Sequence, residues 1–180
     1  HQLAHYLKPT IAMVNGWCFG GAFTPLISCD LAVAAEEAQF GVSEINWGII
    51  PGGQVTKSLA FAMSFRNAMY YTLTGETFDG KQAAAMGIVN EAVPKAKLRE
   101  RTKELALTLK GKNPHALRAC KEAIRACYNI GWESSGDYLA AKSMQLRLVD
   151  DENGRTGGLT QFLDEKSYRP GLGAMRREKK

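Results

Sequence analysis

Two adjacent glycines, Gly20 and Gly21, lie between a short apolar run and a segment of helix-forming residues. The run at residues 10–14 is partly β-branched and is followed by an Asn-Gly turn, a pattern typical of a buried strand. Residues 23–28 are predicted to form a short helix. Adjacent glycines at such a junction permit unusual backbone dihedral angles and the close approach of a ligand. They also leave backbone N–H groups free at the helix start, where an oxyanion or a phosphate is favoured.

The spacing of these glycines excludes two common nucleotide-binding loops. The GxGxxG pattern of dinucleotide-binding loops is absent, and no Lys-Ser or Lys-Thr pair follows as in a P-loop. Neither a nicotinamide cofactor nor a nucleoside triphosphate is therefore indicated. Taken alone, the two glycines are equally consistent with tight packing between a strand and a helix.

The chain divides into an α/β part and a later, mostly helical part. Short strands are predicted at residues 31–35, 39–41 and 88–93, and a loop rich in Gly and Pro at residues 42–53. Periodicity and capping residues predict helices at residues 55–63, 65–74, 80–86, 95–109, 114–128, 132–150 and 156–166. Gly75 is expected to stop the second of these helices, Asp79 to cap the third, and the Asn113-Pro114 pair to open the fifth. Short strands that feed helices indicate an α/β core. Because the late helices have no other core to cover, we expect them to pack on a neighbouring subunit.

One carboxylate differs from the others in its surroundings. Glu44 lies in the segment Ser-Glu-Ile-Asn-Trp-Gly and has apolar residues on both sides. Such a carboxylate is expected to be partly desolvated, which suits a general acid/base. An ordinary loop glutamate that points to water is the alternative that the residues leave open.

Composition limits the other kinds of site. The four cysteines show no CxxC pair and no metal-ligand spacing. Cys120 and Cys127 would share one helical face as small core residues in a reducing, cytoplasmic compartment. With three histidines, neither a zinc site nor a Ser-His-Asp triad is expected. The formal net charge of +5 suits an anionic ligand, and the basic tail is expected to be solvated rather than to bind nucleic acid.

Neither a membrane span nor a signal peptide is expected from the sequence. No apolar run reaches the roughly 18 residues of a membrane span, and the start lacks the pattern of a signal peptide. The chain begins without Met and enters a strand almost at once. We therefore expect the amino-terminal part of a larger fold to be missing.

Several separated motifs together resemble the crotonase (enoyl-CoA hydratase/isomerase) superfamily. They are the glycine loop at 16–22, Cys29-Asp30-Leu31, Ala38-Gln39-Phe40-Gly41, Ser43-Glu44-Ile45 with Gly48 and Pro51-Gly52-Gly53, Thr74-Gly75, residues 83–89, and Val93-Pro94. The resemblance covers essentially the whole chain. It implies an α/β fold, with a partial crotonase-like spiral of ββα units in residues 1–110 and a C-terminal helical oligomerisation region in residues 111–180. It also implies an acyl-CoA substrate, a homotrimer or hexamer, and no cofactor other than the coenzyme A of the substrate.

Within the superfamily the likeness is closest to the 4-hydroxycinnamoyl-CoA (feruloyl-CoA) hydratase-lyases. It rests on residues 15–21, on residues 43–48, and on the tail segments 161–167 and 169–171. The resemblance implies hydration of the thioester, followed by retro-aldol cleavage to acetyl-CoA and an aromatic aldehyde such as vanillin. Two alternatives stay open. They are an enoyl-CoA hydratase or isomerase of other specificity, and a non-catalytic trimeric or nucleic-acid-binding homologue.

The resemblance also assigns catalytic roles to single residues. Glu44 would be the acid/base, and the backbone N–H of Gly21, next to Gly20, would donate to the thioester oxygen. A second N–H donor is expected upstream of this chain. Thr24 stands where ordinary hydratases carry a second glutamate, which is closer to the pattern of the lyases. Helix packing alone is the other interpretation of Thr24.

Five further residues concern substrate binding, and the first of them is Gly20 of the glycine loop. Ser43 and Trp47 would shape the acyl pocket, with plain core packing as the alternative for Trp47. Ala140 stands where the lyases carry a tyrosine that is offered to the neighbouring subunit and holds the phenolic hydroxyl of the substrate. Tyr138 is the substitute candidate, although nearby helical positions point in different directions.

Overall fold

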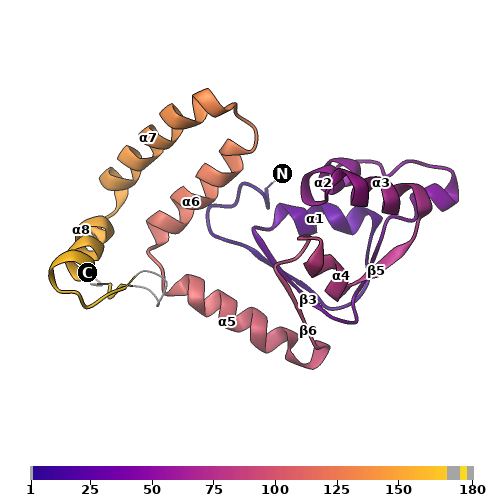
Figure 1. Cartoon of the computed structure of the whole chain (residues 1–180), viewed down its shortest axis with the longest axis horizontal. Helices are drawn as coiled ribbons and strands as arrows, with labels where there is room; N and C mark the ends of the chain where they lie inside the picture. Colours follow the sequence, from indigo (N-terminus) through magenta and orange to yellow (C-terminus); the bar gives the residue numbers. More distant parts are fainter. Residues whose placement is uncertain (1, 170–174, 178–180) are drawn as a thin grey trace. The chain divides into compact units, whose positions relative to one another are not determined.

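The computed structural model describes residues 2–169 and 175–177. Pro170 and Gly171 of the tail motif, and Lys179 and Lys180 of the basic tail, lie outside the described residues. The chain divides into two compact units, His1–Ala106 and Leu107–Lys180. The first is an α/β unit and the second is helical (Figure 1). A boundary after residue 110 stays a prediction.

The α/β unit alternates short strands with short helices. In chain order its elements are β1 (Ile11–Val14), β2 (Cys18–Phe19), the 3-10 turn η1 (Gly20–Ala22), α1 (Phe23–Ser28), β3 (Leu31–Ala35), β4 (Gln39–Gly41), the 3-10 turn η2 (Glu44–Trp47), α2 (Val55–Ala62), α3 (Phe65–Thr74), β5 (Thr77–Asp79), α4 (Gly80–Ala85), β6 (Glu91–Val93), the 3-10 turn η3 (Lys95–Lys97) and the first part of α5 (Leu98–Lys110).

The strands fall into two three-stranded sheets, as a spiral of ββα units requires. One sheet has the order β1-β3-β6 and is parallel throughout. The other has the order β2-β4-β5, in which β2 and β4 are parallel and β4 and β5 are antiparallel. Ile11 pairs with Leu31, and Cys18 pairs with Phe40. Each turn of the chain therefore adds one strand to each sheet, and the predicted partial spiral is confirmed.

Aromatic side chains fill the centre of the α/β unit. Phe40 of β4 stacks on Phe78 of β5, with ring centroids 5.4 Å apart, and Phe23 of α1 meets Phe40 edge-on at 6.4 Å. All three rings are fully buried. Tyr71 of α3 adds a fourth ring, 4.5 Å from that of Phe78. Aromatic contacts of this kind contribute beyond the area they bury, and here they anchor β4, the strand that leads to Glu44.

Local capping explains where the helices of this unit begin and end. Ser64 caps α3 by accepting a hydrogen bond from the backbone N–H of Asn67. Asp79 and Gln82 form a reciprocal capping box at the start of α4. The helix α3 ends at Gly75, which has a left-handed φ of 69°. The stop of α3 at Gly75 and the cap of α4 by Asp79 confirm the predictions made from those residues, and the cap by Ser64 is an additional finding.

The helical unit contains the rest of α5, then α6 (Pro114–Cys127), α7 (Trp132–Val149), α8 (Gly154–Leu159) and one π-helical turn, η4 (Thr160–Asp164). Asn113 caps α6, as predicted, because its side chain accepts a hydrogen bond from the backbone N–H of Ala116 at 2.8 Å. The helices α6 and α7 pack against each other. Lys142 of α7 donates to Glu122 of α6 at 2.8 Å, inside a partly buried pair.

Some details differ from the sequence-based expectations. Only Glu91–Val93 of the expected strand at residues 88–93 is extended, because the N–H of Ile88 donates to Ala83 O at 2.9 Å and closes a turn after α4. The prediction that Cys120 and Cys127 are core residues is wrong for this chain. Within the helical unit, Cys120 on α6 is exposed and Cys127 is half-buried.

The structure also bears on whether the chain has a membrane-spanning helix or a metal site. None of the helices among residues 2–169 and 175–177 is both long and apolar enough to cross a membrane. Within the same residues, no group of three or more His, Cys, Asp or Glu side chains is placed to hold a metal ion.

Candidate active site

The glycine loop leaves the sheet as a short 3-10 turn. Phe19, the last residue of β2, is extended, and η1 follows it without any side-chain cap. The first backbone N–H groups of such a turn have no hydrogen-bond partner within the turn. The N–H of Gly21 is one of these groups. Gly20 has a φ of +47°, which side chains with a β-carbon rarely adopt. The loop therefore presents backbone donors at an exposed position.

Glu44 is the first residue of the other turn, η2. The turn is closed by the N–H of Asn46, which donates to Ser43 O at 3.0 Å, and by the N–H of Gly48, which donates to Ile45 O at 3.1 Å. The N–H of Ile49 donates to Glu44 O at 3.2 Å. The carbonyl groups of Ser43, Glu44 and Ile45 thus all accept backbone hydrogen bonds, which hold the backbone from which the Glu44 side chain projects.

The pairing of β2 with β4 brings these two turns together. Phe19 and Gly41, the last residues of the two parallel strands, are partners in the register. Loops that follow parallel strands leave the sheet at the same edge, where ligands of α/β proteins commonly bind. As a result the Glu44 carboxylate lies against the glycine loop, and a β-carbon built on Gly20 would be only 2.6 Å from Glu44 Oε1.

The second oxygen of this carboxylate is buried and unsatisfied. Among the described residues, Glu44 Oε2 is the buried side-chain oxygen without a hydrogen-bond partner. A buried polar atom without a partner costs free energy, and native structures retain few of them. Next to backbone N–H groups, such an oxygen can accept a proton from a bound molecule or direct a water molecule onto it. The alternative of a loop glutamate pointing to water does not fit this burial.

Thr24 and Ser43 lie close to these turns in the chain without contacting the carboxylate. Thr24 is half-buried in α1, where its backbone oxygen accepts a hydrogen bond from Ser28 Oγ at 2.7 Å. Ser43 precedes η2 and caps it through its backbone oxygen rather than its hydroxyl. Within the described residues, no hydrogen bond joins either hydroxyl to Glu44. Their proposed roles toward a substrate stay predictions.

Large apolar side chains rim the candidate site. Trp47 is 76% exposed, so its interpretation as plain core packing is wrong for this chain. Trp17 of the glycine segment is also exposed, and its ring lies 5.6 Å from that of Phe19. Ile49 and Ile50, which follow η2, are exposed as well. Exposed apolar groups next to an unsatisfied carboxylate are typical of a pocket for an apolar ligand or of a covered interface.

Cys18 lies directly behind the glycine loop but is not a nucleophile. Its side chain is buried, and this burial raises the pKa of the thiol to about 11. The thiolate is the reactive form of cysteine. At neutral pH Cys18 therefore stays protonated and serves the packing under β2.

Tyr138 belongs to the helical unit. It is half-buried on α7, where Lys142 Nζ lies 5.7 Å from the centre of its ring, within the range of a cation–π contact. Its role in holding a substrate hydroxyl stays a prediction.

One contact of the turn η2 does not follow from the sequence. Gly75 is expected from the sequence as the stop of a helix and as part of the Thr74-Gly75 motif, with no contact to the turn of Glu44 implied. In the structure it also lies against Ile45 and Asn46 of η2, so closely that a β-carbon there would be 3.0 Å from Ile45 Cγ2. A Thr-Gly pair at a helix end gives no sign of which loop will lie against it.

Comparison with known proteins agrees with this geometry. Residues 1–169 match the enoyl-CoA hydratase/isomerase family. The chain is 57% identical over 175 residues to a hydroxycinnamoyl-CoA hydratase-lyase of Pseudomonas fluorescens, an alignment that covers 97% of this chain and 63% of that protein. It is 31% identical over 166 residues to a 2,3-dehydroadipyl-CoA hydratase of Escherichia coli, covering 92% of this chain and 64% of that protein. The chain thus spans less than two thirds of the length of both relatives.

Solved structures give the same result for the fold. The crystal structure of enoyl-CoA hydratase subunit I from Geobacillus kaustophilus superposes with a TM-score of 0.85 at 30% sequence identity, covering 99% of this chain and 65% of the other. A second enoyl-CoA hydratase structure from the same organism superposes with a TM-score of 0.83 at 28% identity, over 91% of this chain and 61% of the other.

Proposed function

Because this chain belongs to the enoyl-CoA hydratase/isomerase family, we propose that it carries the acid/base residue of a hydroxycinnamoyl-CoA hydratase-lyase. Its substrate would be a 4-hydroxycinnamoyl-CoA thioester such as feruloyl-CoA. The products would be acetyl-CoA and an aromatic aldehyde such as vanillin. The 57% identity to a hydratase-lyase supports this choice over other members of the family.

The observation that carries the proposal is the unsatisfied Oε2 of Glu44 beside the glycine loop. One carboxylate oxygen contacts the loop while the other is buried without a partner. A reacting water or hydroxyl group would supply the missing hydrogen bond. The N–H of Gly21 would at the same time donate to the thioester oxygen, and one such donor is commonly worth about 3 kcal/mol of transition-state stabilisation.

The first step is the addition of water across the Cα–Cβ double bond. Glu44 takes a proton from water while the water oxygen bonds to Cβ. The electron pair of the double bond moves toward the thioester, and the resulting enolate oxygen is stabilised by the N–H of Gly21. The proton held by Glu44 is then delivered to Cα, which gives the β-hydroxy thioester and restores the carboxylate.

The second step breaks the Cα–Cβ bond in a retro-aldol reaction. Glu44 removes the proton of the β-hydroxyl group, and Cβ becomes the carbonyl carbon of the aldehyde. The bonding pair leaves with Cα as the enolate of acetyl-CoA, again held at Gly21. Protonation of that carbon by Glu44 completes acetyl-CoA. A para-hydroxyl group on the ring assists by delocalising charge, and Thr24 would hydrogen-bond the hydroxyl intermediate.

Two substrates test the proposal directly. The protein that carries this chain is incubated with feruloyl-CoA and, separately, with crotonyl-CoA, and aldehyde, acetyl-CoA and hydrated product are quantified. Release of equal amounts of aldehyde and acetyl-CoA from feruloyl-CoA is expected. Hydration of crotonyl-CoA without any aldehyde from feruloyl-CoA would instead assign an ordinary enoyl-CoA hydratase.

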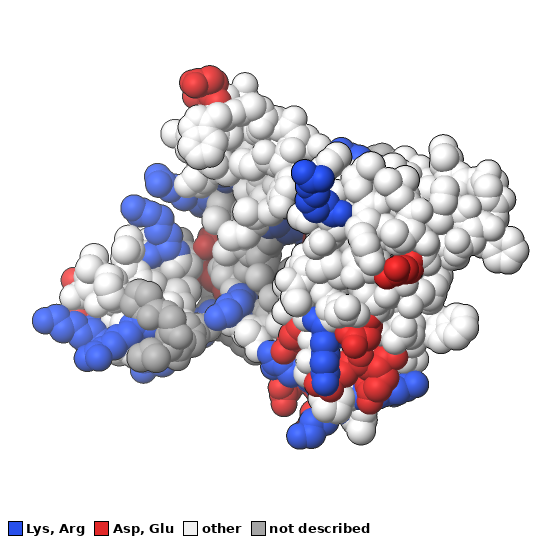
Figure 2. Space-filling view, turned by 45° about the vertical axis from the view of Figure 1, so that its right-hand side comes forward, with Lys and Arg blue, Asp and Glu red and all other residues white. Residues whose placement is uncertain are grey.

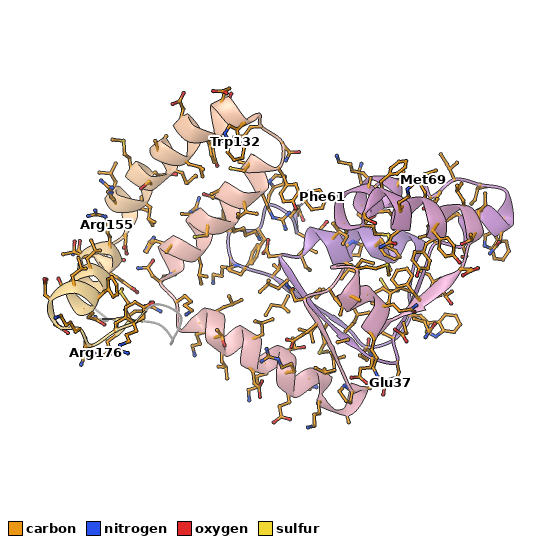
Figure 3. The ribbon with its side chains drawn as sticks, in the orientation of Figure 1. Glu37, Phe61, Met69, Trp132, Arg155 and Arg176 are labelled. Carbon is orange, nitrogen blue, oxygen red and sulfur yellow. The ribbon has the colours of Figure 1, made fainter. Side chains whose placement is uncertain are left out.

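The helical unit supports assembly into a homotrimer or hexamer. Large apolar side chains of this unit are not covered by its own described residues, with Trp132 91% and Leu148 87% exposed on α7. Figure 3 labels Trp132 at the start of α7 and Phe61 and Met69 on α2 and α3 of the other unit, which are also exposed. Apolar surface on this scale marks a contact with another protein surface, and a further copy of the chain would bury it.

The assembly is tested by measuring the mass of the protein in solution. Sedimentation equilibrium of the parent protein and of Leu148→Asp gives this mass. We expect a multiple of the chain mass for the parent and a smaller species for the variant. A parent protein that sediments as a single chain would overturn this part of the proposal.

Charge on the described surface does not favour a nucleic-acid-binding role. Arg176 and Arg177 of the basic tail are engaged in ion pairs with Glu165 and Glu152. On the α/β unit, acidic side chains gather among the basic ones at one end of the visible face, and the rest of that face is largely uncharged (Figure 2). Lys81 of this unit pairs with Glu36, at 3.0 Å.

A further inference from the structure

We infer that Gly75 is a positioning residue for Glu44, because its lack of a side chain lets the end of α3 lie directly against η2. A β-carbon built on Gly75 would be 2.8 Å from Asn46 Nδ2 and 3.0 Å from Ile45 Cγ2. Both residues belong to the four-residue turn that begins with Glu44. The catalytic consequence of this contact rests on the proposed function, whereas the contact itself does not.

On the α3 side of the contact, the backbone at Gly75 is held by hydrogen bonds and by packing of the neighbouring side chains. The N–H of Gly75 donates to Tyr71 O at 3.1 Å, and the ring of Tyr71 packs on the buried Phe78. Across the helix end, the hydroxyl of Tyr70 donates to Glu76 Oε2 at 2.9 Å. The backbone at Gly75 is therefore tied both to the aromatic core and to the start of β5.

The η2 side transmits any displacement to Glu44. Asn46 is exposed, so its amide group can swing away from an added methyl group. Ile45 is also exposed, at 43%, but its Cγ2 is bonded directly to Cβ. Because a β-branched side chain has few χ1 rotamers, this branch moves away less easily than the amide group does. Ile45 follows Glu44 directly in the chain, and the carboxylate of Glu44 has no free space on the side of Gly20. A methyl group at position 75 thus shifts the turn that aims the carboxylate.

The chain offers a matched control for this substitution. Gly87, the residue after the C-cap of α4, has a φ of +78°, close to the +69° of Gly75, but a β-carbon there would meet nothing within 4 Å. Gly75→Ala and Gly87→Ala therefore introduce the same kind of backbone strain, and only the first adds a contact with η2. The difference between the two variants isolates that contact.

The experiment measures the turn and the reaction separately. NMR amide hydrogen exchange of Gly48 and Ile49, whose N–H groups close η2, reports the turn without any substrate. We expect exchange at both amides to be at least about threefold faster in Gly75→Ala than in Gly87→Ala. With feruloyl-CoA we expect kcat of Gly75→Ala to be about tenfold or more below that of Gly87→Ala, with KM within about twofold, since small misplacements of a catalytic group reduce the chemical step strongly.

The outcomes separate this inference from the proposed function. Equal exchange rates in the two variants would overturn the inference, whatever the activity. If exchange is faster in Gly75→Ala but the parent protein does not cleave feruloyl-CoA, the contact between Gly75 and η2 is supported and the lyase assignment is rejected. A double variant, Gly75→Ala with Ile45→Leu, removes the Cγ2 branch and is expected to restore part of kcat relative to Gly75→Ala. Absence of this rescue, with exchange unchanged by the second substitution, would also count against the role of Ile45.

Discussion

The Glu44 carboxylate occupies the space that a side chain at residue 20 would need. A β-carbon built on Gly20 would lie 2.6 Å from Glu44 Oε1 and 3.3 Å from its Cδ. The glycine loop is therefore one wall of the carboxylate's site as well as a source of backbone donors. The two turns that meet here follow β2 and β4, whose ends are paired in the sheet.

Gly20→Ala is expected to displace the carboxylate and reduce turnover. The added methyl group collides with Oε1, and the φ of +47° adds backbone strain. We expect kcat to fall by about a hundredfold, the size of effect that follows a displacement of roughly 1 Å. Gly16→Ala is the control, since a β-carbon at Gly16 would meet nothing within 4 Å. Steady-state kinetics that show equal losses in both variants would contradict the contact.

Glu44→Gln is expected to abolish turnover without loss of stability. The amide keeps the shape of the carboxylate but cannot take up a proton, and positioned acid/base groups contribute about 10²–10⁴-fold in rate. A neutral amide also costs less to bury than a carboxylate whose oxygen has no hydrogen-bond partner. The melting temperature should therefore be equal to or above that of the parent. Activity within a few-fold of the parent would reject Glu44 as the acid/base.

Much of the fold follows from local signals in the sequence. The strand Leu31–Ala35 and the helix Phe65–Thr74 have the bounds that periodicity and capping predict. Asn113 caps its helix as the Asn-Pro pair indicates. These elements are set by side chains within a few residues of their ends, which is why the sequence suffices for them.

The geometry of the candidate site depends on contacts that local signals do not contain. The contact of Glu44 with Gly20 results from strand pairing between residues far apart in the chain. The turn η2 falls inside a segment that the sequence indicates only as a loop. Trp47 shows the same limit, because apolar character alone did not distinguish a buried ring from one that lies at the surface.

The stability of the helical unit is expected to fall as the pH is lowered. The ion pair with Arg177 holds the pKa of Glu152 below its usual value. Burial alone would raise the pKa of Asp150, but hydrogen bonds from Asn113 and from the N–H groups of Gly154 and Glu152 lower it overall. A carboxyl group whose pKa is lowered by folding stabilises the folded state above its unfolded pKa, near 4. This contribution is lost as the pH falls through the lowered, folded-state value.

The measurement is the melting temperature between pH 7 and pH 3, with Arg177→Ala as the comparison. The parent should lose stability below about pH 4, near the unfolded carboxyl pKa. The variant, which lacks the partner of Glu152, should start lower and lose less over the same range. Parallel curves for the two proteins would show that this ion pair does not contribute to the pH dependence.

Asn113→Asp is expected to destabilise the protein although it preserves a good helix cap. The carbonyl oxygen of Asn113 accepts from the N–H of Ala116, while its Nδ2 donates to Asp150 Oδ1 at 2.8 Å and to Glu152 Oε2 at 3.2 Å. Aspartate can cap equally well. It has no donor for the other two contacts and adds a third carboxylate to them, so like charges meet in a partly buried place.

The opposite substitution at the start of α4, Asp79→Asn, separates the effect of capping from this effect of charge. The side chain of Asp79 accepts from the N–H of Gln82 at 2.8 Å and does not need to donate, so Asp79→Asn should change the free energy of unfolding by only a few tenths of a kcal/mol. For Asn113→Asp we expect a loss of about 1–3 kcal/mol at neutral pH, the usual cost of a buried group left without its partner. Urea unfolding measures the free energy of unfolding of both variants.

The loss of stability in Asn113→Asp should shrink as the pH is lowered and the new carboxyl group becomes protonated, because the neutral acid can again donate to Asp150. A loss that is independent of pH would place its origin in the cap instead.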